Sequence, residues 1–181
     1  LAGNDVTTGI QNTLVGANSG DALTDADFNT AIGQDALHLD TKGSRSVAVG
    51  RRSLYTQNFT SSTDSNNTAV GFNSGYSVTT GRNNTLIGQD AGGDITTGQQ
   101  NTIMGSNAGN AITTGSYNVA IGVDALGAET EGQTQIAIGR DALSNSNHSS
   151  QGCENIAIGD SANTTTTDGR NNIAIGKGAN T

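Results

Sequence analysis

The stretch Asn118-Val119-Ala120-Ile121-Gly122 decides the fold, because variants of it recur along all 181 residues of the chain. Ten copies end at glycines that are 17 residues apart in seven of the nine intervals, and 21 and 20 apart in the other two. The motif glycines are Gly16, Gly33, Gly50, Gly71, Gly88, Gly105, Gly122, Gly139, Gly159 and Gly176. A fixed period of this size is typical of a solenoid, in which each repeat is one unit of a stack.

The composition indicates a thin, ordered molecule. Apolar residues make up 32% of the chain and aromatic residues 3%, and there are 26 glycines and no proline or tryptophan. Such polarity alone favours disorder, but disorder gives no reason for an apolar residue beside every motif glycine. The net charge of −8 argues against a nucleic-acid partner. Insertion into a membrane is not expected, because the chain has no run of 18 apolar residues.

The residues that precede each motif glycine predict a short β-strand. The residue directly before it is Val, Ile or Met, and the residue two places earlier is Thr, Val or Ile, so both share one strand face. The residue between them is Leu, Ala or Ile and faces the other way. We therefore expect both faces to be buried. The predicted strand and core ladder is Val15, Ile32, Val49, Val70, Ile87, Met104, Ile121, Ile138, Ile158 and Ile175.

Two further columns predict the turns. An asparagine lies four residues before most motif glycines, and stacked amides can form hydrogen bonds along a stack. This Asn ladder comprises Asn12, Asn29, Asn67, Asn84, Asn101, Asn118, Asn155 and Asn172, with Ser46 and Gln135 in the same column. A second glycine column lies seven residues before the motif glycine in eight repeats: Gly9, Gly43, Gly81, Gly98, Gly115, Gly132, Gly152 and Gly169. We expect both glycine columns to supply positive φ angles.

Short strands and two turns in 17 residues predict an all-β fold, a parallel β-solenoid (β-roll) of about ten coils. Coils stacked about 4.8 Å apart give a rod roughly 48 Å long. A single domain over residues 1–181 is expected, with polar loop insertions near 57–66 and 144–152 that account for the two long intervals.

A coil this small can bury one strand face inside itself, so the other face needs a cover. The expected partner is the protein itself, as a homotrimer around a threefold axis. The chain begins within a repeat and without Met, which we interpret as a processed product or a fragment. Neither end shows a capping element, so end-to-end stacking into a fibre is also expected.

The segments 29–37 (NTAIGQDAL) and 118–126 (NVAIGVDAL) resemble repeats of phage-type tail-fibre proteins. They are also similar to the head repeats of YadA-like trimeric autotransporter adhesins, although the period of 17 is longer than the usual adhesin repeat. The resemblance implies a left-handed, trimeric, extracellular fibre on a cell surface or virion.

No pattern predicts catalysis, a metal site or a cofactor. His38 and His148 lie at polar positions without a recurring carboxylate, so we expect both on the solvated surface. Asp35, Asp90 and Asp124 recur two places after motif glycines, as turn caps and not as a calcium ladder. Cys153 is alone, which excludes an internal disulfide.

The predicted function is therefore structural: a non-enzymatic subunit of an extracellular fibre or filament. The first alternative is a glycan- or receptor-binding head, for which Tyr55 and Phe59 offer an aromatic loop, with Tyr76 and Tyr117 on other coils. The second alternative is an ice-binding solenoid with an exposed Thr array. Sequons mark possible glycosylation at Asn58, Asn147 and Asn163, and a further one begins at Asn83.

Overall fold

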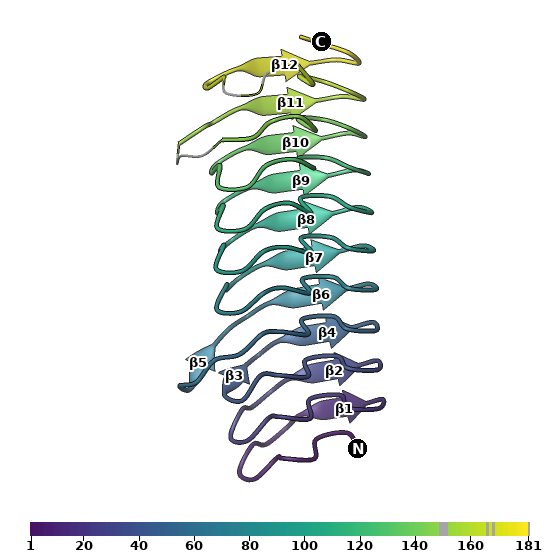
Figure 1. Cartoon of the computed structure of the whole chain (residues 1–181), viewed down its shortest axis with the longest axis vertical. Helices are drawn as coiled ribbons and strands as arrows, with labels where there is room; N and C mark the ends of the chain where they lie inside the picture. Colours follow the sequence, from purple (N-terminus) through teal and green to yellow (C-terminus); the bar gives the residue numbers. More distant parts are fainter. Residues whose placement is uncertain (149–151, 166, 168, 181) are drawn as a thin grey trace.

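The computed structural model describes residues 1–148, 152–165, 167 and 169–180, and these residues form a parallel β-solenoid (Figure 1). The predicted fold class is confirmed. Ten three-residue strands make one sheet, in the order β1 (Thr13–Val15), β2 (Thr30–Ile32), β4 (Val47–Val49), β6 (Thr68–Val70), β7 (Thr85–Ile87), β8 (Thr102–Met104), β9 (Val119–Ile121), β10 (Ile136–Ile138), β11 (Ile156–Ile158) and β12 (Ile173–Ile175). None of the described residues belongs to a helix long and apolar enough to span a membrane.

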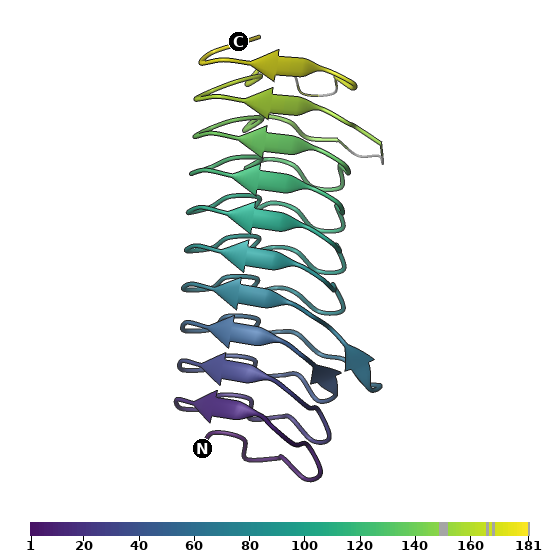
Figure 2. The same cartoon turned by 180° about the vertical axis from the view of Figure 1, so that it is seen from behind.

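The coils stack in register, so each sequence column becomes a ladder along the rod (Figures 1 and 2). Ala120 of β9, for example, lies between Ile103 of β8 and Ala137 of β10, and all the pairings are parallel. The period of 17 residues is therefore the length of one coil.

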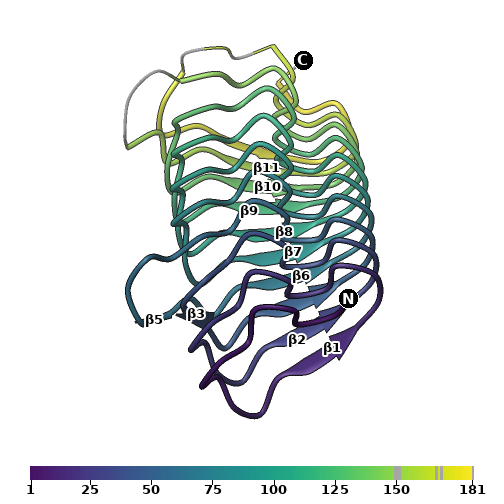
Figure 3. The same cartoon turned by 60° about the horizontal axis from the view of Figure 1, so that its bottom comes forward.

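The core is narrow and runs along the rod axis (Figure 3). The middle residue of each strand points inward: Ala31, Leu86 and Ile103 are fully buried. The small residues three places after the motif glycines, such as Ala91 and Ala108, close the same interior.

The other strand residues face outward, so within a single chain they do not form the predicted core ladder. Val15 is 55% exposed and Ile175 is 68% exposed, while Ile87 and Ile121 are half-buried. The residues before the motif glycines belong to the strands, as predicted, but they lie outside the coil. A 17-residue coil has room for one strand face only, and the middle residue of each strand occupies it, which is Ala in most strands and Leu or Ile in β1, β7 and β8.

The motif glycines are required for two reasons. Gly88 has a φ of +137°, and a Cβ there would lie 2.4 Å from the carbonyl oxygen of Gly105 in the next coil. The same clash recurs from Gly16 to Gly159. A side chain in this column would thus separate the coils.

In the second glycine column the predicted positive φ is found at Gly152 (φ +79°), but the regular coils use their glycine differently. Gly81 and Gly98 lack a positive φ, and they are glycine because a Cβ would lie 2.5 and 2.4 Å from carbonyl oxygens of the next coil. The left-handed conformation falls two residues later, on Asn83, Gln100 and Tyr117. Side-chain size, and not the φ angle, fixes this corner.

The insertion at 57–66 leaves the stack as a protruding loop (Figures 1 and 3). Within it, β5 (Thr63–Asp64) pairs with β3 (Gly43–Ser44) as a small second sheet. The loop is not wholly solvent-facing, since Gln57 and Phe59 are buried. Residues 149–151 of the other predicted insertion lie outside the described residues.

Candidate functional site

The outer strand face is one continuous uncharged stripe. In all ten strands the two outward residues are Thr, Val, Ile or Met. Thr occupies neighbouring coils only in β1–β2 and in β6–β8, and Val or Ile replaces it elsewhere. The face is therefore more apolar than a regular Thr array would be, and it is most apolar at β10 to β12.

The Asn column bonds mainly to backbone. In the Asn101 coil, the side-chain Oδ1 accepts a hydrogen bond from the Asn118 N–H of the next coil (3.0 Å), and Nδ2 donates to the Gly115 carbonyl (3.0 Å). The pattern repeats at Asn12, Asn29, Asn67, Asn84, Asn118 and Asn155. Direct amide–amide bonds join Asn101 to Asn84 and Asn172 to Asn155. These residues tie each turn to the next coil and leave no free amide for a ligand.

The coil that precedes each insertion contains a buried carboxylate. The Asp40 Oδ1 atom accepts hydrogen bonds from the Gly43 and Phe59 N–H groups, both at 3.0 Å, and Oδ2 accepts one from Gln57. Two serines, Ser46 and Ser65, extend the network. Asp40, Gln57, Ser46 and Ser65 are all inaccessible to solvent.

Glu129 forms the equivalent network at the second insertion. Its Oε1 accepts from the N–H groups of Gly132 (2.7 Å) and His148 (3.0 Å), and its Oε2 lies 2.8 Å from His148 Nδ1. Burial raises the pKa of Glu129, but the hydrogen bonds from His148, Gln135 and Gly132 together outweigh it and hold the pKa below its ordinary value of 4.5.

His148 is thus not a solvated surface residue, as the sequence analysis expected; it is 3% exposed. Its Nε2 lies 2.9 Å from the Gly169 carbonyl oxygen, so both ring nitrogens have partners inside the coil. Glu129 and His148 together combine a carboxylate with an imidazole, but both side chains are buried, so a substrate cannot reach them. We assign the pair a structural role.

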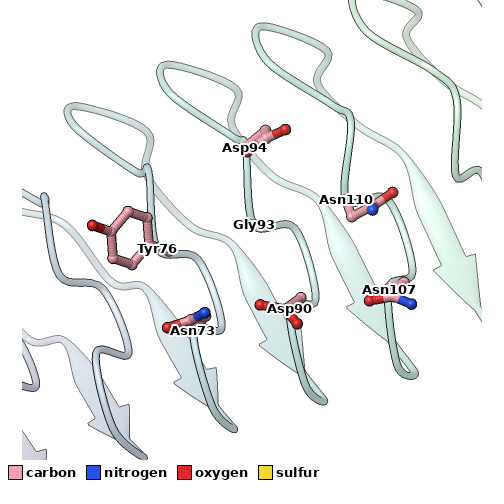
Figure 4. Close-up of a pocket in the computed structure, with 7 residues that line it drawn as sticks. All are labelled: Asn73, Tyr76, Asp90, Gly93, Asp94, Asn107 and Asn110. Atoms are coloured by element: carbon pink, nitrogen blue, oxygen red, sulfur yellow. The ribbon is translucent and has the colours of Figure 1, made fainter.

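An open hollow of about 320 Å³ lies on the turns that follow β6, β7 and β8 (Figure 4). Its centre is Gly93. Around it lie Asn73, Tyr76, Asp90, Asp94, Asn107 and Asn110. The volume is at the lower end of those of small-molecule sites.

A ladder of rings ends at this hollow. The ring of Tyr55 stacks on His38 with centroids 5.3 Å apart, and Tyr76 stacks on Tyr55 at 5.2 Å and an interplanar angle of 3°. All three residues lie five places after their motif glycine, and Gly93 holds that position in the next coil. The ladder therefore lacks its next rung, and one face of Tyr76 borders the hollow (Figure 4).

Comparisons with protein-family models, with curated proteins and with solved structures gave no match. The arrangement of side chains therefore carries the functional argument.

Within the described part of the chain, no group of three or more His, Cys, Asp or Glu residues could hold a metal ion. The aspartates that follow motif glycines lie in left-handed turns, for example Asp90 with φ of 52°.

The remaining predicted residues are dispersed. Asn58 and Asn147 are exposed, and each accepts a hydrogen bond from a Thr hydroxyl of the preceding coil. Asn163 is fully buried, which contradicts its expected role as a sugar acceptor.

Phe59 is buried beside Asp40, so Tyr55 and Phe59 do not form an exposed aromatic loop. The hollow at Gly93 was not predicted from the sequence. The sequence does indicate it, because the position five places after the motif glycine is aromatic in three successive coils and glycine in the next: His38, Tyr55, Tyr76 and Gly93.

Proposed function

We propose that this protein is a structural, non-enzymatic fibre subunit that assembles with copies of itself through the outer strand face. The uncharged stripe over ten consecutive strands carries the proposal. Solvent-exposed apolar area of this extent is typical of an interaction surface. The buried carboxylates of Asp40 and Glu129 accept hydrogen bonds from backbone N–H groups, which supports a structural role for both.

A homotrimer is the proposed assembly. Three rods around a common axis bury the same stripe three times, and the closed symmetry leaves no strand face free to recruit a further copy. The most apolar strands, β10 to β12, then form the driest part of the interface. The extracellular location belongs to the same proposal, because it follows from the resemblance of the repeats to those of surface fibres.

Sedimentation velocity of the wild-type chain tests this proposal, with three chain masses as the expected result. Ile121→Asp places a charge in the middle of the stripe without touching the interior, so it should give a monomer with an unchanged circular dichroism spectrum. Thr114→Asp, at an exposed turn residue, is the matched control and should remain trimeric. A wild-type monomer at micromolar concentration would refute the proposal, and a series of growing sizes would indicate end-to-end stacking instead.

A further inference from the structure

We propose that the hollow at Gly93 binds one neutral pyranose ring of a glycan, with Tyr76 as the stacking platform. The ring ladder supplies the first argument. Tyr76 is covered on one face by Tyr55 at 5.2 Å, while its other face borders the hollow because Gly93 has no side chain. The apolar C–H face of a pyranose packs against an aromatic ring in the same way as another ring does.

The spacing of the coils makes the gap the size of one ring. Successive rungs are one coil apart, and Asn110 is the next residue in this column after Gly93. Tyr76 and Asn110 are thus separated by two coil spacings, or roughly 10 Å. A flat ring fits in a gap of this width, and Figure 4 shows Tyr76 and Asn110 on either side of the Gly93 coil.

The rim of the hollow matches the hydroxyl groups of a sugar. Asn73, Asn107 and Asn110 offer amides, and Asp90 and Asp94 offer carboxylates, so that donors and acceptors surround the gap. The Asn73 Oδ1 atom accepts no hydrogen bond from any described residue and is shielded from water, so a sugar hydroxyl bonds to it once the Asn73 side chain turns toward the hollow. That turn satisfies an acceptor that the fold leaves unpaired.

The negative charge around the hollow determines which class of sugar it binds. Asp90 and Asp94 lie on either side of Gly93, and the chain carries a net charge of −8. Acidic sugars are therefore repelled, and neutral ones are preferred.

The test is saturation-transfer NMR on the full chain. The probes are the neutral methyl glycosides of glucose, galactose and mannose, with N-acetylneuraminic acid as the acidic probe. We expect at least one neutral glycoside to bind with a Kd on the order of 1 mM, as is typical of a single small contact, and the acidic sugar to bind at least about tenfold more weakly.

Three variants locate the binding. Tyr76→Ala should abolish the signal and Tyr76→Phe should retain most of it. Gly93→Tyr should also abolish it by supplying the missing rung. Gly93 has an ordinary φ, and the nearest atom to a new Cβ is the Asp90 carbonyl oxygen at 3.3 Å, so the Asp90 backbone has to shift slightly to admit the side chain.

The matched control for Gly93→Tyr is Ser144→Tyr, at the same column position three coils away and half-buried, and it should bind as the wild type does. The idea is overturned if no neutral glycoside binds, or if binding survives Tyr76→Ala and Gly93→Tyr. Repeating the measurement on Ile121→Asp separates this site from the proposed assembly, because the hollow lies within one chain.

Discussion

The corner of a coil that is followed by another regular coil differs from the corner of a coil that precedes an insertion. In the first kind the residue seven places after the motif glycine is apolar, as at Ile95 and Ile112. In the two coils that precede an insertion it is a buried carboxylate, Asp40 or Glu129. The amide of Gly81 donates to the Thr96 carbonyl of the next coil, whereas the amides of Gly43 and Gly132 donate to these carboxylates.

The difference shows what an insertion requires of a solenoid. Where the next coil diverges into a loop, the corner amides lose the carbonyl groups that normally accept from them. A buried donor without a partner is costly, and one carboxylate oxygen accepts from two or three such amides at once. Each of these two buried carboxylates therefore replaces missing backbone acceptors at a point where the stack is interrupted.

The largest expected effect comes from breaking the regular coils themselves. Gly88→Ala forces a Cβ to 2.4 Å from the Gly105 carbonyl oxygen at a φ of +137°. We expect the free energy of unfolding to fall by more than about 5 kcal/mol, or the chain not to fold. Urea denaturation measures this. Gly93→Ala is the control and should stay within about 0.5 kcal/mol of wild type; equal losses in both variants would contradict the account.

Giving the coil before an insertion the apolar corner of the other coils should have the next largest effect. Glu129→Ile leaves the Gly132 and His148 amides without an acceptor. The expected loss is roughly 3 kcal/mol in urea denaturation. The control Ile95→Val removes one methyl group from a regular coil and should cost about 1 kcal/mol. A Glu129→Ile variant as stable as wild type would mean that the carboxylate does not support the corner.

A smaller effect is expected at the tie between regular coils. Asn101→Ala removes the bonds to the Asn118 amide and the Gly115 carbonyl, at a cost of about 2 kcal/mol. Hydrogen exchange adds a local measurement, since the Asn118 amide should lose protection while the amides of β2 do not. Uniform loss along the rod would show that the Asn column acts globally.

The smallest expected effect separates the two kinds of coil by pH. Because the pKa of Glu129 in the folded chain lies below 4.5, its contribution to stability is present above about pH 4.5 and is lost as the pH falls through the folded pKa. Urea denaturation below pH 4.5 should therefore show a steeper loss for wild type than for Glu129→Gln. Parallel curves would exclude Glu129 as the source.

The repeating columns made the strands, the stacking and the period predictable, because each column has one environment in ten coils. Which strand face turns inward was not predictable, since both faces are apolar in sequence and only the coil volume decides between them. The His148 environment escaped prediction because its partner, Glu129, lies 19 residues away in another coil. The hollow at Gly93 escaped for a related reason: an absent side chain matters only once its neighbours are placed.

Because the coils stack in register, the number of coils determines the length of the rod. Each strand pairs only with the strands of the coils before and after it. Duplication of one 17-residue unit between β7 and β9 would lengthen the rod by a single inter-strand spacing, about 4.8 Å, and every other coil would keep its neighbours. Length is thus a quantity that simple repetition of a gene segment can adjust in fixed steps, without redesign of the interior.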